Sequence, residues 1–237
     1  GKAMLVYSRI APLVRKSGKT TFADYVALIR NDPGERRQAV EALTTNHTFF
    51  YRESHHFDHF ESKVRPDLVR KLECGSPVRL WSAGCSSGEE TWSLMMALLG
   101  TDPLAAKRMA KRDLRVLASD LAPHALRKAE AATYAAKDFK GVPSDLAQQW
   151  VRIEGEKAVI AGLPRSVVRF RLLNLMGEWP MSGKFDTIFC RNVMIYFDQP
   201  TKERLVARFA EVLQPGGHLY IGHSERVTGP AASVLEP

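Results

Sequence analysis

The chain has 237 residues, 45% hydrophobic and 25% charged, a composition typical of a globular protein with room for one sizeable α/β domain and a small accessory region. A formal net charge of +8 predicts an acidic partner, whether nucleic acid, anionic lipid or an acidic protein surface. Three cysteines without C-x-x-C spacing argue against a disulfide framework or a zinc site, and the most apolar charge-free run, residues 91–101, is too short to span a bilayer. Because the start of the chain shows no signal-peptide pattern, we expect a cytoplasmic protein.

Residues 1–72 are predicted to form a small helical domain and a linker. Amphipathic patterns indicate helices at 22–29 and 35–43, and Pro12 should kink the first helix or mark its start. Residues 1–45 contain eight Lys or Arg against four Asp or Glu. This excess fits either a solvated helix surface or a docking surface for an acidic partner, and the sequence leaves both open.

The next segment is rich in aromatic residues and histidines. Its simplest explanation is a capped turn held in place by Phe49 and Phe50. His55, His56 and His59 have no neighbouring Cys or paired acid that would complete a metal shell. We therefore expect these histidines on a surface helix and expect no metal site.

A strand, a glycine loop and a helix are predicted within residues 78–99. The apolar run 78–83 is typical of a buried strand, the small residues 84–88 form a tight turn, and an apolar helix follows Glu89 and Glu90. Such a unit begins nucleotide-type α/β folds, in which a ligand lies at the carboxyl end of the strand. The loop reads G-x-x-x-G rather than G-x-G-x-x-G, which disfavours a dinucleotide.

Four more strands of the same sheet are predicted, at residues 114–119, 167–170, 185–190 and 218–222. Helices at 123–131 and 201–213 separate them, so the chain should form a doubly wound, mostly parallel α/β sheet covered on both faces. Two further β-like pieces, 150–153 and 158–160, predict a small antiparallel β insert at about 148–170.

Polar residues follow two of these strands, at the sheet edge where ligands bind in doubly wound folds. Asp120 comes directly after the strand 114–119. It can accept hydrogen bonds from the two hydroxyls of a ribose or cap the next helix, and both roles fit the spacing. Arg191 and Asn192 follow the strand 185–190 in the same way.

Five longer motifs occur in order along the chain: LTTNHTFFYRESHHF (43–57), WSAGCSSGEE (81–90), ASDLAPHALRKA (118–129), FDTIFCRNVMIYFD (185–198) and LQPGGHLYIGHSE (213–225). Over nearly the whole chain they resemble the CheR family, S-adenosylmethionine-dependent methyltransferases that methylate glutamates on methyl-accepting chemotaxis receptors. The resemblance implies a Rossmann-like methyltransferase domain at 73–237 and a receptor-facing helical domain at 1–72. It implies S-adenosylmethionine as the cofactor, which is converted to S-adenosylhomocysteine. It also implies that the partners are cytoplasmic receptor helices, with no binding of nucleic acid or metal and no direct insertion into a membrane.

The resemblance also assigns a cofactor site, made of Asn46, Thr48, Arg52, Ala83, Glu89, Glu90, Asp120, Asn174, Leu175, Arg191 and Asn192. In this set Asp120 would hold the ribose, and Asn174 and Leu175 would border the adenine. One of Glu89 and Glu90 would face the methionine end. Because Ser87-x-x-Glu90 also reads as a capping box, the choice between the two stays open.

The implied reaction needs no general base. A glutamate side chain has a pKa of about 4.3 and is already ionised at neutral pH, so catalysis rests on alignment and desolvation. Arg52 and Tyr196 are the candidates for orienting the acceptor carboxylate, Arg52 through charge-assisted hydrogen bonds.

The chain departs from the family pattern in two ways. The turn 154–157 of the β insert is shorter than in members that bind a receptor's carboxyl-terminal peptide, which predicts an enzyme that needs no such tether. The family also has a helix before residue 2 and about two strands after residue 225, so we expect a trimmed chain. Two alternatives remain. One is a nucleic-acid methyltransferase, which is disfavoured because no prolines follow Asn192, and the other is a non-catalytic module that binds the cofactor in a signalling assembly.

Overall fold

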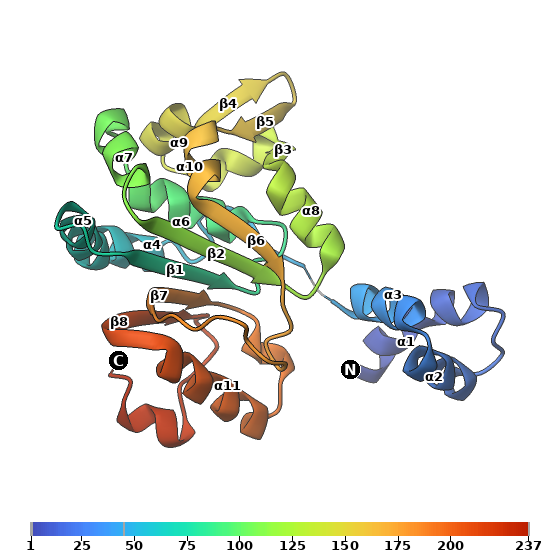
Figure 1. The fold of residues 1–237 in the computed structure, drawn as a ribbon. Helices are drawn as coiled ribbons and strands as arrows, with labels where there is room; N and C mark the ends of the chain where they lie inside the picture. Colours follow the sequence, from blue (N-terminus) through green and yellow to red (C-terminus); the bar gives the residue numbers. More distant parts are fainter. Residues whose placement is uncertain (1, 45, 237) are drawn as a thin grey trace.

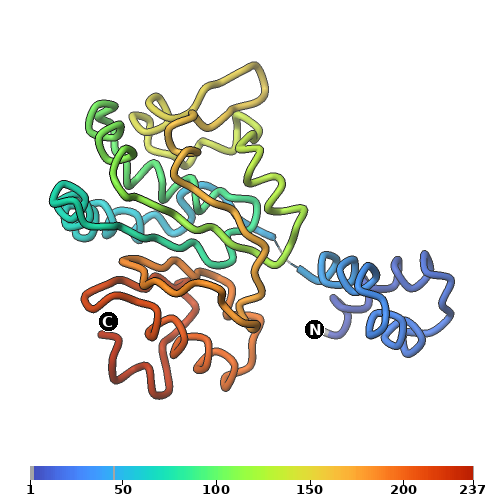
Figure 2. The backbone as a smooth tube through the Cα atoms, in the orientation of Figure 1, coloured from blue at the N-terminus to red at the C-terminus, as the bar shows by residue number. Residues whose placement is uncertain are grey.

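The computed structural model describes residues 2–44 and 46–236. The amino-terminal helices α1 (Lys2–Lys16), α2 (Phe22–Asn31) and α3 (Pro33–Leu43) form a body of their own beside the rest of the chain (Figures 1 and 2). Their small core consists of the buried residues Ile10, Val14, Tyr25 and Ala39. Two of them begin at polar caps: the Thr21 side chain caps α2, and the Asp32 carboxylate accepts hydrogen bonds from the backbone N–H groups of Gly34 and Glu35 at the start of α3. The predicted helical character of this region is confirmed, and Pro12 lies inside α1.

The main body is built on a five-stranded sheet in which all neighbouring strands are parallel. The strand order is β6-β2-β1-β7-β8, formed by β1 (Val78–Ala83), β2 (Leu114–Asp120), β6 (Val168–Leu172), β7 (Phe185–Cys190) and β8 (Leu213–Ile221). This order places the two halves of the sheet on either side of β1, as in a doubly wound fold, and confirms the predicted class. In Figure 1 the arrows of β1, β2 and β6 point toward the helical domain.

Alternation along β1 divides the hydrophobic core into two layers. Val78 and Leu80 face one side, with helices α4 to α6, and Trp81 and Ala83 face the other, where α11 packs. The covering helices are α4 (His55–His59), α5 (Arg65–Glu73), α6 (Glu89–Leu99), α7 (Pro103–Ala110), α8 (Pro123–Ala131) and α11 (Gln199–Val212). A π-helical turn, Phe60–Val64, joins α4 to α5. Among the described residues, no helix has the length and apolar character needed to cross a membrane.

A small antiparallel sheet, order β3-β5-β4, is inserted between β2 and β6. Its hairpin, β4 (Val151–Glu154) and β5 (Lys157–Ile160), was predicted, whereas the third strand, β3 (Thr133–Ala135), was not. Three residues are too few to show an alternating pattern, so this strand had no sequence signal. The helices α9 (Ser144–Trp150) and α10 (Gly162–Val167) flank the hairpin.

The loop between β1 and α6 depends on Gly88. This residue has a φ of +96° and is the N-cap of α6, with no side chain capping the helix. A Cβ atom at Gly88 would lie 2.7 Å from the Cβ of Ala129 and 2.8 Å from the hydroxyl of Tyr134. The expected Ser87-x-x-Glu90 capping box is therefore not formed, because the chain turns one residue later than the motif requires.

We expect Gly88→Ala to lower the free energy of unfolding by about 3 kcal/mol, because it adds both an unfavourable positive φ and a clash with α8. Gly155→Ala is the matched control, since Gly155 also has a positive φ (+63°) but nothing lies within 4 Å of its added Cβ. This control should cost only about 1 kcal/mol. Urea unfolding measures both, and equal losses would show that the contact with α8 is unimportant.

Candidate functional site

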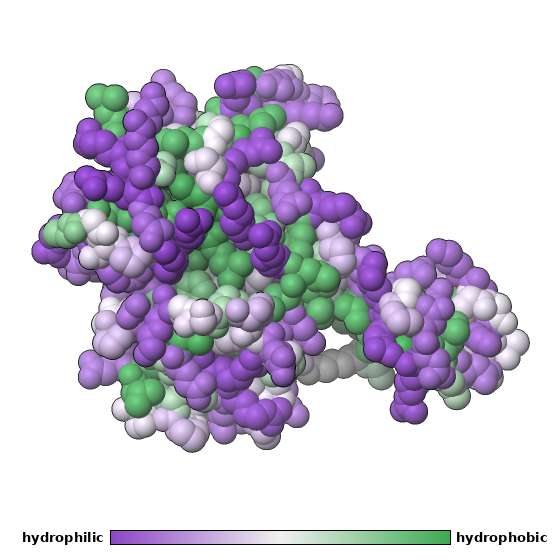
Figure 3. Space-filling model, in the orientation of Figure 1, coloured by the Kyte–Doolittle hydropathy of each residue, from purple (hydrophilic) through white to green (hydrophobic). Residues whose placement is uncertain are grey.

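A cavity of about 420 Å³ lies between the helical domain and the carboxyl ends of the strands. Such a volume is within the roughly 300–1,000 Å³ of small-molecule sites. Its walls are Val40, Leu43, Thr44, Asn46, His47, Thr48, Arg52, Gly84, Cys85, Ser86, Glu90, Asp120, Leu121, Leu173, Asn174, Leu175, Met176, Arg191, Asn192, Val193, Tyr196 and Phe197. Hydrophobic residues gather near the end of β6 on the side toward the helical domain (Figure 3).

The residues that follow four strands line this cavity in the order of the strands in the sheet. Leu173 to Met176 follow the edge strand β6, Asp120 ends β2, Gly84 to Ser86 follow β1, and Arg191 to Val193 follow β7. Moving across the sheet, the wall therefore changes from mainly apolar to a single carboxylate and then to charged groups. A ligand with an apolar ring, a diol and a zwitterionic end fits this sequence of surfaces.

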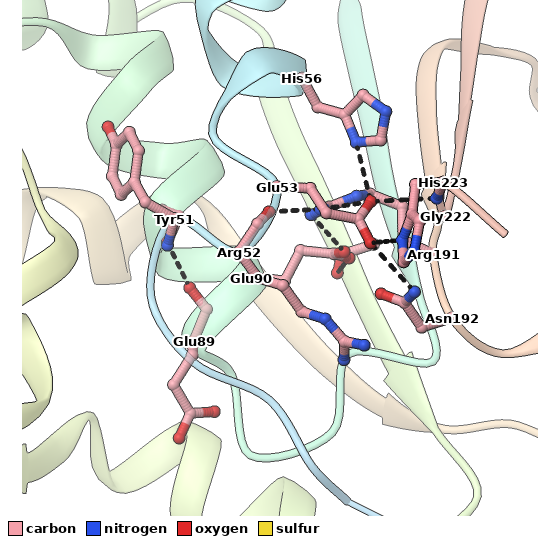
Figure 4. Close-up of polar contacts among 12 residues, drawn as sticks. Tyr51, Arg52, Glu53, His56, Glu89, Glu90, Arg191, Asn192, Gly222 and His223 are labelled. Atoms are coloured by element: carbon pink, nitrogen blue, oxygen red, sulfur yellow. Dashed lines mark hydrogen bonds and ion pairs between the residues drawn. The ribbon is translucent and has the colours of Figure 1, made fainter.

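A carboxylate that the sequence analysis did not assign, Glu53, ties the site together. Its Oε2 accepts from Arg191 Nη2 (3.1 Å) and from the backbone N–H of His223 (3.2 Å). Its Oε1 accepts from Asn192 Nδ2 (3.2 Å) and hydrogen-bonds His223 Nδ1 (2.8 Å), so all these groups converge on it (Figure 4). Burial opposes ionisation of Glu53, but the hydrogen bonds from His223, Asn192 and Arg191 outweigh it and lower its pKa to about 2.

Arg191 is the buried cation of the cluster. Its side chain is 1% exposed and lies between two carboxylates, with Nη1 3.4 Å from Glu90 Oε2 and Nη2 on Glu53. The same Nη2 donates to the backbone oxygen of Arg52, and the guanidinium lies 5.5 Å from the ring centre of Phe57. Arg191 thus anchors the segment before α4 to the end of β7.

A second unassigned carboxylate, Glu225, holds the turn after β7. It accepts hydrogen bonds from the backbone N–H groups of Gly222 (2.7 Å), Asn192 (3.0 Å) and Ile195 (3.2 Å). Asn192 has a φ of +60°, a conformation that this carboxylate helps to retain. The turn carries Tyr196, which lines the cavity with half of its surface exposed.

The two adjacent glutamates of α6 have different roles. Glu90 lines the cavity and accepts from Ser82 Oγ at 2.8 Å, and its burial raises its pKa. Glu89 points away from the cluster (Figure 4). Its carboxylate accepts a hydrogen bond from Ser87 Oγ (2.7 Å) and pairs with Lys128 (3.4 Å). The structure therefore places Glu90, not Glu89, at the cavity.

Asp120 lies at the cavity and also organises its floor. Oδ2 accepts from the backbone N–H of Ser86 (2.7 Å) and Oδ1 from that of Ala122 (2.9 Å), and burial raises the pKa of the carboxyl group. The N-cap of α8 is Ala122, so Asp120 is not the helix cap that was considered as an alternative. Each carboxylate oxygen keeps a lone pair for a further donor. Next to it, the hydroxyl of Ser86 is buried without a partner among the described residues, which leaves it free for a ligand in the cavity.

The other predicted residues divide into two groups. Asn46, Thr48, Arg52, Asn174, Leu175, Arg191, Asn192 and Tyr196 line the cavity. Ala83 does not, because its fully buried side chain packs in the core beneath the loop, as expected for the last inward position of β1. Asn46 Nδ2 lies 2.9 Å from His124 Nε2, which links the segment after α3 to α8. His55 and His59 are exposed, as expected, whereas the His56 side chain is only 17% exposed, and this burial lowers its pKa to about 4.

We expect Glu53→Gln to destabilise the chain at pH 7 by on the order of 3 kcal/mol, since an amide cannot accept from all these donors or balance Arg191. The pKa of Glu53 falls from 4.5 to about 2 on folding. Its stabilisation is therefore present above pH 4.5 and is lost as the pH falls toward 2. Urea unfolding at several pH values should show the variant and wild type converging in acid. Glu154→Gln, on the exposed edge of β4, is the control, and a gap independent of pH would contradict the assignment.

Two known protein families match the chain. Residues 46–234 match "CheR methyltransferase, SAM binding domain", and residues 1–44 match "CheR methyltransferase, all-alpha domain". The first match begins at Asn46 and the second ends at Thr44, and both of these residues line the cavity.

Several curated proteins are similar along most of their length. A "Probable chemotaxis protein methyltransferase" of Rhizobium etli is 41% identical, over 99% of this chain and 88% of the relative. Proteins named "Chemotaxis protein methyltransferase" are 35% identical in Borreliella burgdorferi (96% of this chain, 82% of the relative) and 36% identical in Escherichia coli (94% and 77%). With the S-adenosylmethionine-binding domain matched over nearly all of the main body, the chain belongs to the CheR family and is an S-adenosylmethionine-dependent chemotaxis protein methyltransferase.

Proposed function

We propose that this enzyme methylates glutamate side chains on the cytoplasmic helices of methyl-accepting chemotaxis receptors, giving glutamate methyl esters for sensory adaptation. The observation that carries the proposal is the contrast between two arginines at the cavity. Arg191 is balanced by Glu53 and Glu90, whereas Arg52 pairs with no carboxylate in the part of the chain that the structure describes. Arg52 is thus the cation left for an acceptor carboxylate.

The cavity surfaces suggest how S-adenosylmethionine is held. The apolar residues after β6, with Asn174 and Leu175, would border the adenine, and the Asp120 carboxylate would accept from the ribose hydroxyls. The Glu90 carboxylate would face the ammonium of the methionine end, close to Arg191 and Asn192. When bound, the cofactor supplies an electrophilic methyl group on a positively charged sulfur.

The residues around Arg52 would position the acceptor. A glutamate carboxylate is ionised at neutral pH, so no proton has to be removed before its oxygen attacks the methyl carbon. The Arg52 guanidinium donates to the backbone oxygen of His47 (2.9 Å) and lies 5.8 Å from the Phe49 ring centre, which restricts its motion. The half-exposed Tyr196 offers a hydroxyl donor on the other wall. Both would hold the carboxylate in line and away from water.

The proposal extends to the division of the chain. We infer that residues 1–72 act as the receptor-facing domain with its linker and residues 73–237 as the donor-binding domain, in the cytoplasm. Support comes from the excess of basic residues in the first part, because receptor helices that carry several glutamates are acidic.

Methyl transfer from radiolabelled S-adenosylmethionine to receptor cytoplasmic fragments tests the function. We expect label that alkali releases as methanol, the mark of a carboxyl ester. Arg52→Ala should lower kcat by about 10²-fold or more. Tyr196→Phe should lower kcat by about 10-fold while leaving donor binding nearly unchanged. Arg204→Ala, an exposed arginine of α11, should keep full activity.

The alternatives have distinct outcomes in this assay. Alkali-stable label on RNA or DNA would indicate a nucleic-acid methyltransferase. Tight calorimetric binding of the donor without transfer to any acceptor would indicate a non-catalytic module.

Independence of a tethering peptide is the finer part of the proposal. The β4–β5 hairpin closes through a two-residue turn at Gly155 and Glu156, which offers little surface for a docked peptide. We expect receptor fragments with and without their last five residues to be methylated at rates within about twofold of each other. Micromolar binding of the free pentapeptide would contradict this expectation.

A further inference from the structure

A second cavity, of about 460 Å³, lies at the amino ends of β2 and β6, the strand ends opposite to those that line the first cavity. It is formed by residues 110–115, which lead from α7 into β2, and by Ser166, Val167 and Arg169, where α10 leads into β6. Strand β2 runs from this cavity to Asp120, so its seven residues separate the two cavities by roughly 20 Å. Nothing in the proposed methyl-transfer reaction uses this second cavity.

The charged side chains of this second cavity are mostly positive. The lining side chains include Lys111, Arg112, Arg115 and Arg169, against one carboxylate, Asp113. That carboxylate is already engaged, with Oδ2 2.7 Å from Arg79 Nη2 and Oδ1 3.4 Å from Arg115 Nε. Asp113 therefore cannot neutralise the remaining cations.

Of the other cations, the side chains of Lys111 and Arg112 have no partner among the described residues, and Arg169 is held in place by backbone oxygens. Both situations favour binding of an anion. The side chains of Lys111 and Arg112 make no hydrogen bond or ion pair with any residue in the ranges 2–44 and 46–236. Arg169 is held at the cavity, because its Nη1 donates to the backbone oxygens of Ser166 (3.1 Å) and Val168 (2.9 Å). A concave surface with one sign of charge concentrates counter-ions, and a fixed guanidinium loses little freedom when it binds one.

We propose that this cavity binds a small anion that carries two or more phosphate groups. Guanidinium groups match phosphate oxygens in geometry, and several cations on different segments can contact more than one phosphate at once. No aromatic side chain is among the described lining residues, so nothing there would stack on a base. Recognition would rest on the phosphates, whether they belong to a soluble oligophosphate or to a diphosphate lipid headgroup.

Calorimetry of the full chain with tripolyphosphate and ATP tests the proposal. Both should bind with similar affinity, and Lys111→Gln with Arg112→Gln should weaken binding at least about tenfold. These two side chains have no partner to lose, so this double variant should fold like wild type. Arg152→Gln with Lys157→Gln, two exposed cations of the β4–β5 hairpin, removes the same charge elsewhere and should change the affinity less than about twofold.

A parallel arm uses vesicles of phosphatidylcholine with and without cardiolipin, a lipid with two phosphates. Binding of tripolyphosphate without vesicle binding assigns a soluble ligand, and vesicle binding that requires Lys111 and Arg112 assigns the headgroup. Equal weakening by the two double variants would show attraction by net charge alone and overturn the site. If neither tripolyphosphate nor the cardiolipin vesicles bind, the proposal is overturned as well.

Discussion

The structure of the site depends on the carboxylate of Glu53, whose side chain is largely buried (11% exposed). Glu53 accepts hydrogen bonds from Arg191, Asn192 and His223, which come from the ends of β7 and β8, while Glu53 itself belongs to the segment before α4. A buried charge is costly unless donors surround it, and here the donors come from two stretches, after β7 and after β8, that are both far from Glu53 in the sequence. Folding the main body therefore brings these stretches together and builds one wall of the cavity.

This arrangement also decides which charges are available to ligands. Arg191 is enclosed by Glu53 and Glu90, so its charge is balanced inside the protein and its role is to hold the chain. Arg52, next to Glu53 in the sequence, has its backbone oxygen fixed by Arg191 while its own guanidinium remains at the cavity. The same interaction thus stabilises the site and presents the cation on which the proposed acceptor binding rests.

Much of the fold could be predicted from local patterns, because apolar runs such as those of β1 and β7 and the turn signals between them identify strands without tertiary information. The cavity residues at strand ends, Asp120, Arg191 and Asn192, followed from the rule that ligands bind at this edge. Other features had no local signal. The strand β3 is too short for a pattern, and the role of Glu53 depends on partners more than 130 residues away. The predicted capping box is not formed, because Gly88 takes the N-cap position. A glycine is needed there, since any Cβ atom at this position would clash with α8.

We propose that the cavity above the strand ends holds the methyl donor with its sulfur facing Arg52 and Tyr196. A crystal structure of the chain with S-adenosylhomocysteine tests it most directly. We expect the ribose hydroxyls on Asp120, the amino group near Glu90, and the Arg52 guanidinium and Tyr196 hydroxyl on the side of the sulfur that an acceptor would approach. A ligand bound elsewhere, or a sulfur shielded from both side chains, would contradict the claim.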